Sequence, residues 1–505
     1  MRIVKKYELT NEVLVYKGKK LWRIRHIPTD TVGGWVESYD NLSQYGSCMV
    51  WDDAKVYGNA RVYEDAIIDG SASVYDDAEV FGNAVIHDNV TVFNQAKIYG
   101  KAEVTTEAVV QDQAQVLGNA KVEQFAKIGG HAVVYGHAKI SGHAEILDYA
   151  RVYGYSQVLN NAIVKEDGLV HGHVIVKDST IVQGKEEVFD GQYTWDDIKS
   201  FSTLKLYIEE SISNTGANLY ANGRHQVQVE VIIKAKDVMD RYIKIPETEI
   251  FQHIQFVNYR NDPFGDRFQY SDSAGDYCTG LSFSNESNSL NDESSSATFY
   301  LSTLEPMGKT LLCVSCMVTK VTKGVVTMEE YSTAIENNSR RPMPYSVTLQ
   351  VMPPYSFNNQ DIEVVRHVKN EKSYTLTTNY VRFKPNNTHR LRAGICQSSY
   401  NFYEEGLGTA GKYYSAISTD NIVETNDQLF SYRFGNSKTG YLTVTDYNHE
   451  YTGLCFWIYY KRESVNNSLK ENLMLCSLLD IYGNEAKLRI MILPGDRTVL
   501  NVIVL

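Results

Sequence analysis

The first half of the chain is organised by a hydrophobic repeat with a period of six residues. From Ala54 to Lys185 the sequence divides into 22 hexads, or 132 residues, with no insertion or deletion. The third position of every hexad is Val or Ile, and the first position is Ala in 17 of them. The hexad that starts at Cys48 extends the repeat backward by one unit.

This spacing predicts short parallel strands that wind into a triangular coil. Side chains alternate along a strand, so positions one and three point the same way. The fifth and sixth positions are rich in Gly, Asn, Asp and His, which tolerate turn conformations. Three strands and three corners then close one coil, with Val and Ile inside and Ala where space is tight. The pattern is typical of a left-handed parallel β-helix, an exception to the right-handed crossover preference. We predict an N-terminal cap over 1–41 and the β-helix over 42–185.

After residue 185 the pattern changes to alternating β-strands. Residues 186–200 are expected to form a cap or linker, with Thr194 as the N-cap of a short helix. Strand patterns at 204–208, 227–233 and 347–351 precede MPPYSFNN at 352–359, the best candidate for a domain boundary. More strands follow, ending in a hairpin at 488–493 and 498–505.

The expected fold class is therefore all-β, with the left-handed parallel β-helix followed by antiparallel β-sandwich modules at 201–355 and 356–505. One helix is predicted to interrupt the strands at 327–336. There Thr327 and Glu330 match a capping box.

Outward positions of the β-helix predict an aromatic row. Residues 18 apart lie above one another, and the fourth hexad positions of one face are Tyr63, Phe81, Tyr99, Leu117, Tyr135 and Tyr153. Because exposed apolar stripes mark interfaces, these six are the candidate binding or interface residues. Three explanations stay open. The rings stack for stability or lie under a sister subunit, they bind a sugar or a partner strand, or the chain's own C-terminal half covers them.

Two segments resemble known families. The segment GGWVES at 33–38 and then Asn-Leu-Ser at 41–43 lead into A-x-V-x-G-N hexads. Residues 1–185 thereby resemble bacterial and prophage-encoded hexapeptide-repeat proteins. The similar coils of acyltransferases and γ-type carbonic anhydrases imply a homo-oligomer, with a trimer favoured. Residues 216–237 resemble the opening strands of bacterial Ig-like modules, where an Asn-Gly turn precedes a long strand.

Composition and charge limit the classes of partner and the cellular location that we expect for the protein. The formal net charge of −12 argues against a nucleic-acid partner, which needs a basic surface. No apolar run approaches the roughly 20 residues that span a bilayer. Glu8, Asn11 and Glu12 stand where a signal peptide needs an apolar block, so no signal peptide is predicted. We expect synthesis in the cytoplasm, followed by release or incorporation into a phage-like particle. Seven scattered cysteines are expected to be reduced thiols.

Three motifs suggest chemistry but lack its context. His131, His137 and His143 occupy the sixth positions of consecutive hexads, so they should lie at different corners, too far apart to share zinc. Residues 406–412 match the letters of a phosphate-binding loop, but Tyr413 stands where magnesium binding needs Ser or Thr. Cys313 and Cys316 lie in an apolar strand and are expected to pack in a core. We predict no catalytic residue, no metal and no cofactor.

The expected function is structural and non-enzymatic. A β-helical stalk would present β-sandwich modules that recognise a host-cell receptor or glycan, as in a phage-like adhesin. The first alternative is a cell-targeting toxin, insecticidal or pore-forming, whose Ser-rich segment at 285–297 would rearrange at a host membrane. The second is a hexapeptide-repeat acyltransferase or an enzyme like carbonic anhydrase.

Overall fold

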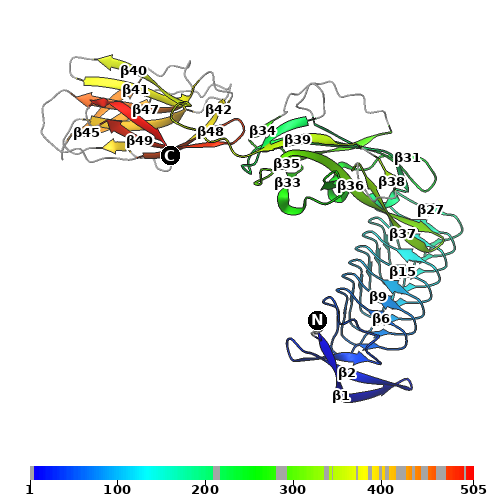
Figure 1. Cartoon of the computed structure of the whole chain (residues 1–505). Coiled ribbons are helices and arrows are strands. Elements are labelled where there is room, and N and C mark those ends of the chain that lie inside the picture. Colours follow the sequence, from blue (N-terminus) through cyan, green and yellow to red (C-terminus); the bar gives the residue numbers. More distant parts are fainter. Residues whose placement is uncertain are drawn as a thin grey trace.

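The computed structural model is nearly all β and consists of a parallel β-helix followed by two groups of sheets (Figure 1). It describes residues 5–208, 216–279, 293–334, 341–343, 345–370, 374–384, 389–396, 401–403, 409–416, 428–434, 438–444, 453–461, 474–493 and 496–505. The predicted fold class, a parallel β-helix followed by antiparallel sheets, is confirmed. In Figure 1 the β-helix and the two sheet groups follow one another, with the N-terminal cap at the far end of the β-helix.

The N-terminal cap is an antiparallel sheet of three strands that merges with the first coil. Its strands are β1 (Tyr7–Tyr16), β2 (Lys19–His26) and β3 (Thr31–Val36). The last two residues of β3 pair in parallel with β5. Gly34 permits this junction, because a Cβ there would lie 2.6 Å from the backbone oxygen of Ala54.

The β-helix has three parallel faces built from two-residue strands. Face A contains β5 (Lys55–Val56), β8 (Ser73–Val74), β11 (Thr91–Val92), β14 (Val109–Val110), β17 (Lys127–Ile128), β20 (Glu145–Ile146), β23 (Ile163–Val164) and β26 (Ile181–Val182). Face B contains β6 (Arg61–Val62), β9 (Glu79–Val80), β12 (Lys97–Ile98), β15 (Gln115–Val116), β18 (Val133–Val134), β21 (Arg151–Val152), β24 (Leu169–Val170) and β27 (Glu187–Val188). Face C contains β4 (Met49–Val50), β7 (Ile67–Ile68), β10 (Val85–Ile86), β13 (Glu103–Val104), β16 (Lys121–Val122), β19 (Lys139–Ile140), β22 (Gln157–Val158) and β25 (Ile175–Val176).

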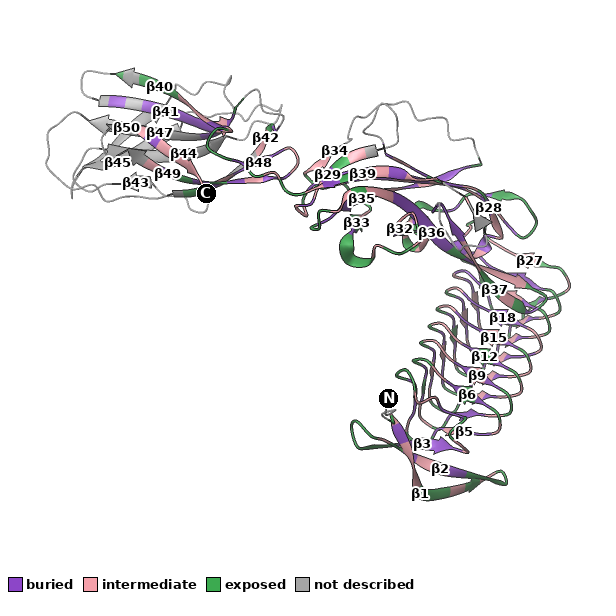
Figure 2. Cartoon of the chain, viewed as in Figure 1, coloured by how far each residue is buried: buried purple, intermediate pink, exposed green. Residues whose placement is uncertain are grey.

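The hexad positions take the predicted places. The Ala and Val or Ile side chains of the first and third positions form one continuous buried core, and buried and more exposed residues alternate along each coil (Figure 2). Fifth-position residues turn the corners with positive φ, for example 69° at Gly58 and 58° at Asp76, which explains the Gly, Asn and Asp found there. The parallel ladder runs one strand past the predicted boundary at 185, because β27 pairs with β24.

The first group of sheets surrounds a core of its own. One sheet contains β28 (Ser200–Ile208), β30 (Gln226–Lys236), β31 (Tyr242–Ile243), β33 (Gln269–Ser271), β34 (Cys278–Thr279) and β35 (Ser295–Ser302). The other contains β29 (Gly216–Tyr220), β32 (Gln255–Val257), β36 (Gly308–Thr322), β37 (Val325–Ser332), β38 (Arg341–Pro342) and β39 (Val347–Met352). Three short helices accompany these strands: η1 (Trp195–Asp197), α1 (Glu247–His253) and η2 (Gly265–Arg267).

One prediction for this region is wrong. Residues 327–332 of the predicted helix 327–336 instead belong to strand β37, which pairs with β36 along its whole length as a hairpin. Residues 335–336 lie outside the described residues. The hairpin turns at Lys323 and Gly324, whose φ values of 47° and 74° suit a tight two-residue turn. The Asn-Gly turn at 222–223 precedes the long strand β30, as predicted, while β29 before the turn pairs with β39 of the other sheet.

The second group of sheets follows β39 and has its own core, which includes Phe357 and Val381. Its first sheet contains β40 (Ile362–Asn370), β41 (Tyr374–Phe383), β43 (Asn401–Tyr403), β44 (Thr409–Ala416) and β47 (Gly453–Lys461). Its second contains β42 (Leu391–Cys396), β48 (Met474–Asp480), β49 (Glu485–Leu493) and β50 (Asp496–Val504), and β45 (Gln428–Phe434) pairs with β46 (Lys438–Val444). The predicted final hairpin is confirmed as β49 and β50. Cys476 is disulfide-bonded, so the expectation of reduced thiols throughout is wrong.

Candidate functional site

The predicted aromatic row lies on face B, and its rings stack along the helix axis. The ring centroids of Tyr63 and Phe81 are 4.8 Å apart, and those of Phe81 and Tyr99 are 4.7 Å apart, with the planes within 4° of parallel. Tyr135 stacks on Tyr153 at 4.7 Å. The 18-residue spacing therefore places these side chains in one row, as predicted.

The chain itself covers one half of this row. Leu117, Tyr135 and Tyr153 are 4%, 4% and 2% exposed, and we call them the covered stripe. Val321 and Val326, on the two strands of the β36–β37 hairpin, pack against this cluster. These three candidates are thus unavailable to a second molecule, which corrects their assignment as interface residues. Of the three explanations, cover by the C-terminal half applies to them.

Side chains of face B and of the linker also bind the hairpin backbone. Gln115 Nε2 donates to the carbonyl oxygen of Gly324 at 2.8 Å. Arg151 Nη1 donates to that of Val321 at 3.5 Å. The indole nitrogen of Trp195 donates to the carbonyl of Met317 at 2.8 Å. The hairpin is therefore attached to the β-helix by apolar packing and by hydrogen bonds along its length.

In the other half of the row, Tyr99 packs against the edge of this cluster, and Phe81 and Tyr63 lie beyond it. Tyr63, Phe81 and Tyr99 are half-buried, and we call them the open stripe. The Tyr99 hydroxyl donates to Gln115 Oε1 at 3.1 Å, and burial raises the pKa of this phenol to about 12. Because the rings stack face to face, they present mainly their edges to solvent.

A row of charged side chains runs beside the open stripe. Arg61, Glu79 and Lys97 occupy the second positions of the same three hexads, and Glu79 forms ion pairs with both Arg61 and Lys97. Burial raises the pKa of Glu79, but the hydrogen bonds from Lys97 and Arg61 outweigh burial and hold it below its usual value. Glu79 is therefore charged at neutral pH, and the row carries one net positive charge.

The end of the β-helix and the linker share a buried polar cluster, which we call the joint. His171 is 2% exposed, and its Nδ1 lies 2.6 Å from Asp197 Oδ1 while its Nε2 lies 3.0 Å from Glu187 Oε1. Asp197 Oδ2 accepts the backbone N–H of Thr194 at 2.7 Å, which forms the predicted cap of η1. The His171 ring stacks between Tyr153 and Phe189, so the joint continues the aromatic row.

The joint brings further carboxyl groups together. Glu249 of α1 accepts the Tyr155 hydroxyl at 3.1 Å and the backbone N–H of Trp195 at 2.9 Å. Burial, and then the charges of Asp197 and Glu249, raise the pKa of Asp196 to about 7. The sequence does not reveal this cluster, because its members come from three separate elements and follow no motif.

The three corner histidines lie apart and stack on separate rings. His131 stacks on Tyr149 at 4.7 Å, and His137 stacks on Tyr155 at 4.7 Å. His143 stacks on Phe125 at 4.8 Å. Across the described ranges, no group of three or more His, Cys, Asp or Glu side chains is placed to hold a metal ion.

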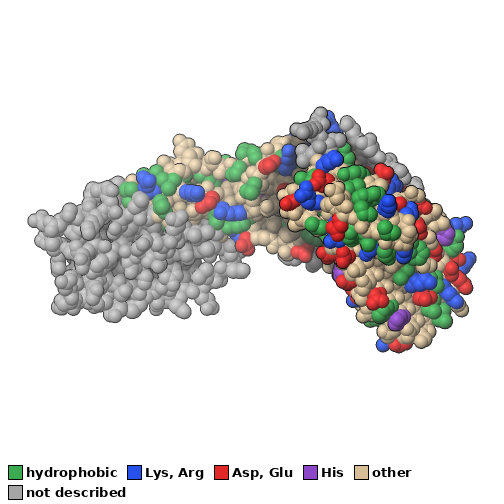
Figure 3. All heavy atoms as spheres, turned by 90° about the horizontal axis from the view of Figure 1, so that it is seen from below, with side chains coloured by type: hydrophobic (Ala, Val, Ile, Leu, Met, Phe, Trp, Pro, Cys, Tyr) green, Lys and Arg blue, Asp and Glu red, His purple; other side chains and the backbone are tan. Residues whose placement is uncertain are grey.

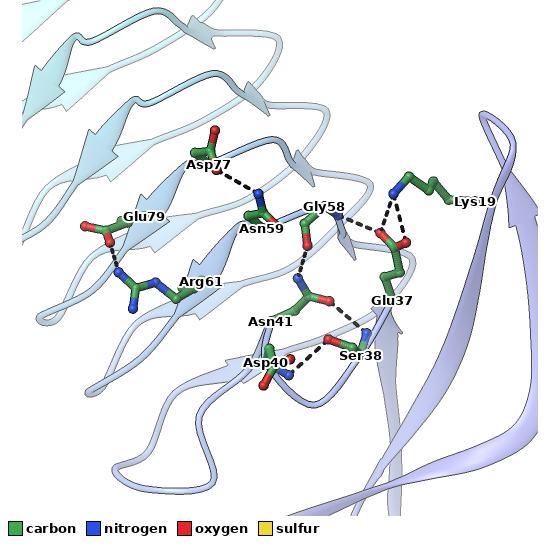
Figure 4. A pocket seen from close by; sticks show the side chains of 10 residues that line it. All are labelled: Lys19, Glu37, Ser38, Asp40, Asn41, Gly58, Asn59, Arg61, Asp77 and Glu79. Atoms are coloured by element: carbon green, nitrogen blue, oxygen red, sulfur yellow. Dashed lines mark hydrogen bonds and ion pairs between the residues drawn. The ribbon is translucent and has the colours of Figure 1, made fainter.

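A polar cleft of about 600 Å³ lies where the N-terminal cap meets the first coils (Figure 4). Its lining residues are Lys19, Glu37, Ser38, Asp40, Asn41, Gly58, Asn59, Arg61, Asp77 and Glu79. Most of their polar groups bind one another. Lys19 Nζ lies 2.9 Å from Glu37 Oε1, and Asn59 Nδ2 donates to Asp77 Oδ1 at 2.9 Å. The lining contains no His or Cys, and its one hydroxyl, on Ser38, accepts the backbone N–H of Asp40. These ten residues therefore hold no pair of nucleophile and imidazole base.

The described residues of the glycine-rich, Ser-rich and cysteine motifs lie mainly in β-strands. Lys412 of the glycine-rich segment lies within β44, between antiparallel neighbours, whereas a phosphate-binding loop leads into a helix. Residues 406–408 of that segment and 285–292 of the Ser-rich segment lie outside the described residues, and Ser295–Ala297 belong to β35. Cys313 and Cys316 are buried, and burial raises the pKa of the Cys316 thiol.

The surface and the helices bear on two classes of partner. On the face shown in Figure 3, basic and acidic side chains are interspersed over the described residues. In the part of the chain that is described, no helix has the length and apolar character needed to cross a membrane.

No family model matches the chain, and no curated protein sequence matches it.

Proposed function

We propose that this protein is a binding protein in which a rigid β-helical stalk presents the C-terminal sheets to a cell surface or glycan. The observation that carries the proposal is the attachment of the first sheet group to face B. A hairpin packed on the covered stripe, with backbone carbonyls bound by Gln115, Arg151 and Trp195, restrains hinge motion between stalk and module. A stiff stalk that holds a module at a fixed angle is suited to presentation.

The contact between the two sheet groups supports the same arrangement. Asn222 Nδ2 donates to the carbonyl oxygen of Tyr482 at 2.9 Å and to Asn484 Oδ1 at 3.0 Å. Arg224 donates to the carbonyl of Gly483 at 3.3 Å. These bonds join the turn before β30 to the turn between β48 and β49, so the second group is also held by side-chain contacts.

The unbroken repeat favours binding over catalysis. Hexapeptide-repeat acyltransferases resemble this β-helix in their coils, but they use loops that leave the coils to place a catalytic residue or close over a cofactor. This chain has 22 hexads without an insertion. We also expect self-association, with a trimer favoured, and a host-cell receptor or glycan as the partner.

A binding screen of the full chain against a glycan array and intact cells tests the proposal. Saturable binding without leakage of dye from liposomes is the expected result. Leakage would favour the toxin alternative, and turnover of an acyl donor or hydration of carbon dioxide would favour the enzyme alternative. Either outcome would contradict the proposal.

A further inference from the structure

The covered stripe shows how face B holds a β-hairpin. The second and the fourth positions of the hexads on this face both contribute. Fourth-position side chains such as Tyr135 form an apolar row against which Val321 and Val326 pack. Second-position side chains Gln115 and Arg151 donate hydrogen bonds to carbonyl oxygens of the hairpin.

The open stripe repeats both features on the next coils toward the N-terminus. Tyr63, Phe81 and Tyr99 continue the apolar row at fourth positions. Arg61 and Lys97 continue the row of donors at second positions, with Glu79 between them. The surface that receives the hairpin is therefore longer than the hairpin that occupies it.

The chain's own hairpin ends before this surface does. Its turn residue Gly324 lies against His131, since a Cβ on Gly324 would be 2.7 Å from the Cβ of His131. Tyr99 touches the edge of the covered cluster, whereas Phe81 and Tyr63 lie further toward the N-terminal cap. Both are half-buried, and neither belongs to the cluster that contains Val321 and Val326.

The stacked rings favour a protein strand over a sugar. A sugar ring binds best over the face of an aromatic ring, but both faces of Phe81 are occupied by Tyr63 and Tyr99. Ring edges and a row of donors instead match the valine side chains and carbonyl oxygens that a β-strand presents. The continuous row extends an existing interface.

We propose that the open stripe is a docking strip for a β-hairpin of a partner protein, held in the same way as the β36–β37 hairpin on the covered stripe. The partner hairpin carries β-branched residues against Phe81 and Tyr99 and places carbonyl or carboxylate oxygens toward Lys97 and Arg61. This interface is separate from the C-terminal sheets proposed to bind a cell surface.

The chain's own hairpin supplies a probe. A labelled cyclic peptide of residues 317–330, in which cyclisation holds the hairpin, is titrated into the full-length protein and followed by fluorescence anisotropy. The peptide should bind the Phe81→Ser variant at least tenfold more weakly than it binds the wild type, a loss of about 1.4 kcal/mol. Phe93→Ser is the matched control, because Phe93 has the same hexad position on face A and also stacks on a tyrosine.

Tyr63→Ser is a second test variant, because Tyr63 lies at the free end of the row, and circular dichroism checks that each variant is folded. Peptide binding lost in Phe81→Ser and Tyr63→Ser but kept in Phe93→Ser supports the proposal. It is overturned if the wild type does not bind the peptide, or if all variants bind it equally. Loss of self-association or of glycan binding in Phe81→Ser, with peptide binding unchanged, would equally overturn it.

Discussion

Replacing Asp196 by Asn should stabilise the joint at neutral and alkaline pH. Burial and the nearby carboxylates of Asp197 and Glu249 raise the pKa of Asp196 from 3.8 to about 7. The folded carboxyl therefore stays protonated at a pH where the unfolded one has ionised. Asn keeps the shape of the protonated acid and cannot ionise.

The magnitude and sign follow from proton linkage. One pKa unit corresponds to about 1.4 kcal/mol, so a shift from 3.8 to about 7 costs the ionised wild type about 4 kcal/mol. Below pH 4 both states are protonated, and this cost is absent. Between pH 4 and 7 the free energy of unfolding falls as the unfolded carboxyl releases its proton. Above pH 7 both states are ionised, and the cost is constant.

Calorimetric unfolding of wild type and Asp196→Asn at pH 4, 6 and 8 measures this effect. The variant should match the wild type at pH 4 and exceed it by roughly 2–4 kcal/mol at pH 8. Asp167→Asn is the control, because Asp167 is an exposed corner residue of the same β-helix. A variant that is equally stable or less stable than the wild type at pH 8 would refute the reasoning.

Three further predictions test the stalk. Val116→Asp places an unpaired charge in the core, where Val116 is 0% exposed. We expect the free energy of unfolding to fall by several kcal/mol, and an unchanged melting temperature by circular dichroism would argue against the coil. Val326→Asp should release the hairpin from the covered stripe, so that trypsin cleaves after Lys323 faster than in the wild type; equal cleavage rates would count against the packing described. Replacing His131, His137 and His143 by Asn should keep the fold and binding, at a cost of about 0.5–1.5 kcal/mol for each lost ring stack; release of bound metal, measured by mass spectrometry, would contradict the stacking role.

The β-helix could be predicted because its information is local and repeated. Each hexad carries its own inward Val or Ile and its own corner residue, so one rule places every strand from β5 to β26. The stacking of Tyr63 on Phe81 follows from the same period. Even β27 obeys the rule, since Val188 occupies a third position of one more hexad.

The cover of the row and the joint could not be predicted in the same way. Val326 lies far from Tyr135 in sequence, and no local pattern indicates that the two pack together. The joint likewise depends on Glu249 of α1 reaching Tyr155 of the β-helix. Contacts of this kind arise from tertiary packing of separate elements.

The prediction of a helix at 327–336 was wrong because it depended on a short motif and not on the residues that flank this motif. Thr327 and Glu330 match a capping box in spacing, but the turn at Gly324 and the β-branched Val325 and Val326 favour a strand. Pairing with β36 decides the outcome. Glu330 instead accepts a hydrogen bond from Asn261 at 2.6 Å.

The orientation of the protein on its target tests the central proposal most directly. Cryo-electron tomography of the full chain, bound to the cells or glycan-coated vesicles identified by the screen, would show which end makes contact. We predict that the C-terminal sheets touch the surface while the β-helix projects away at a constant angle. A β-helix that lies flat on the surface, or that takes a different angle in each particle, would contradict the account.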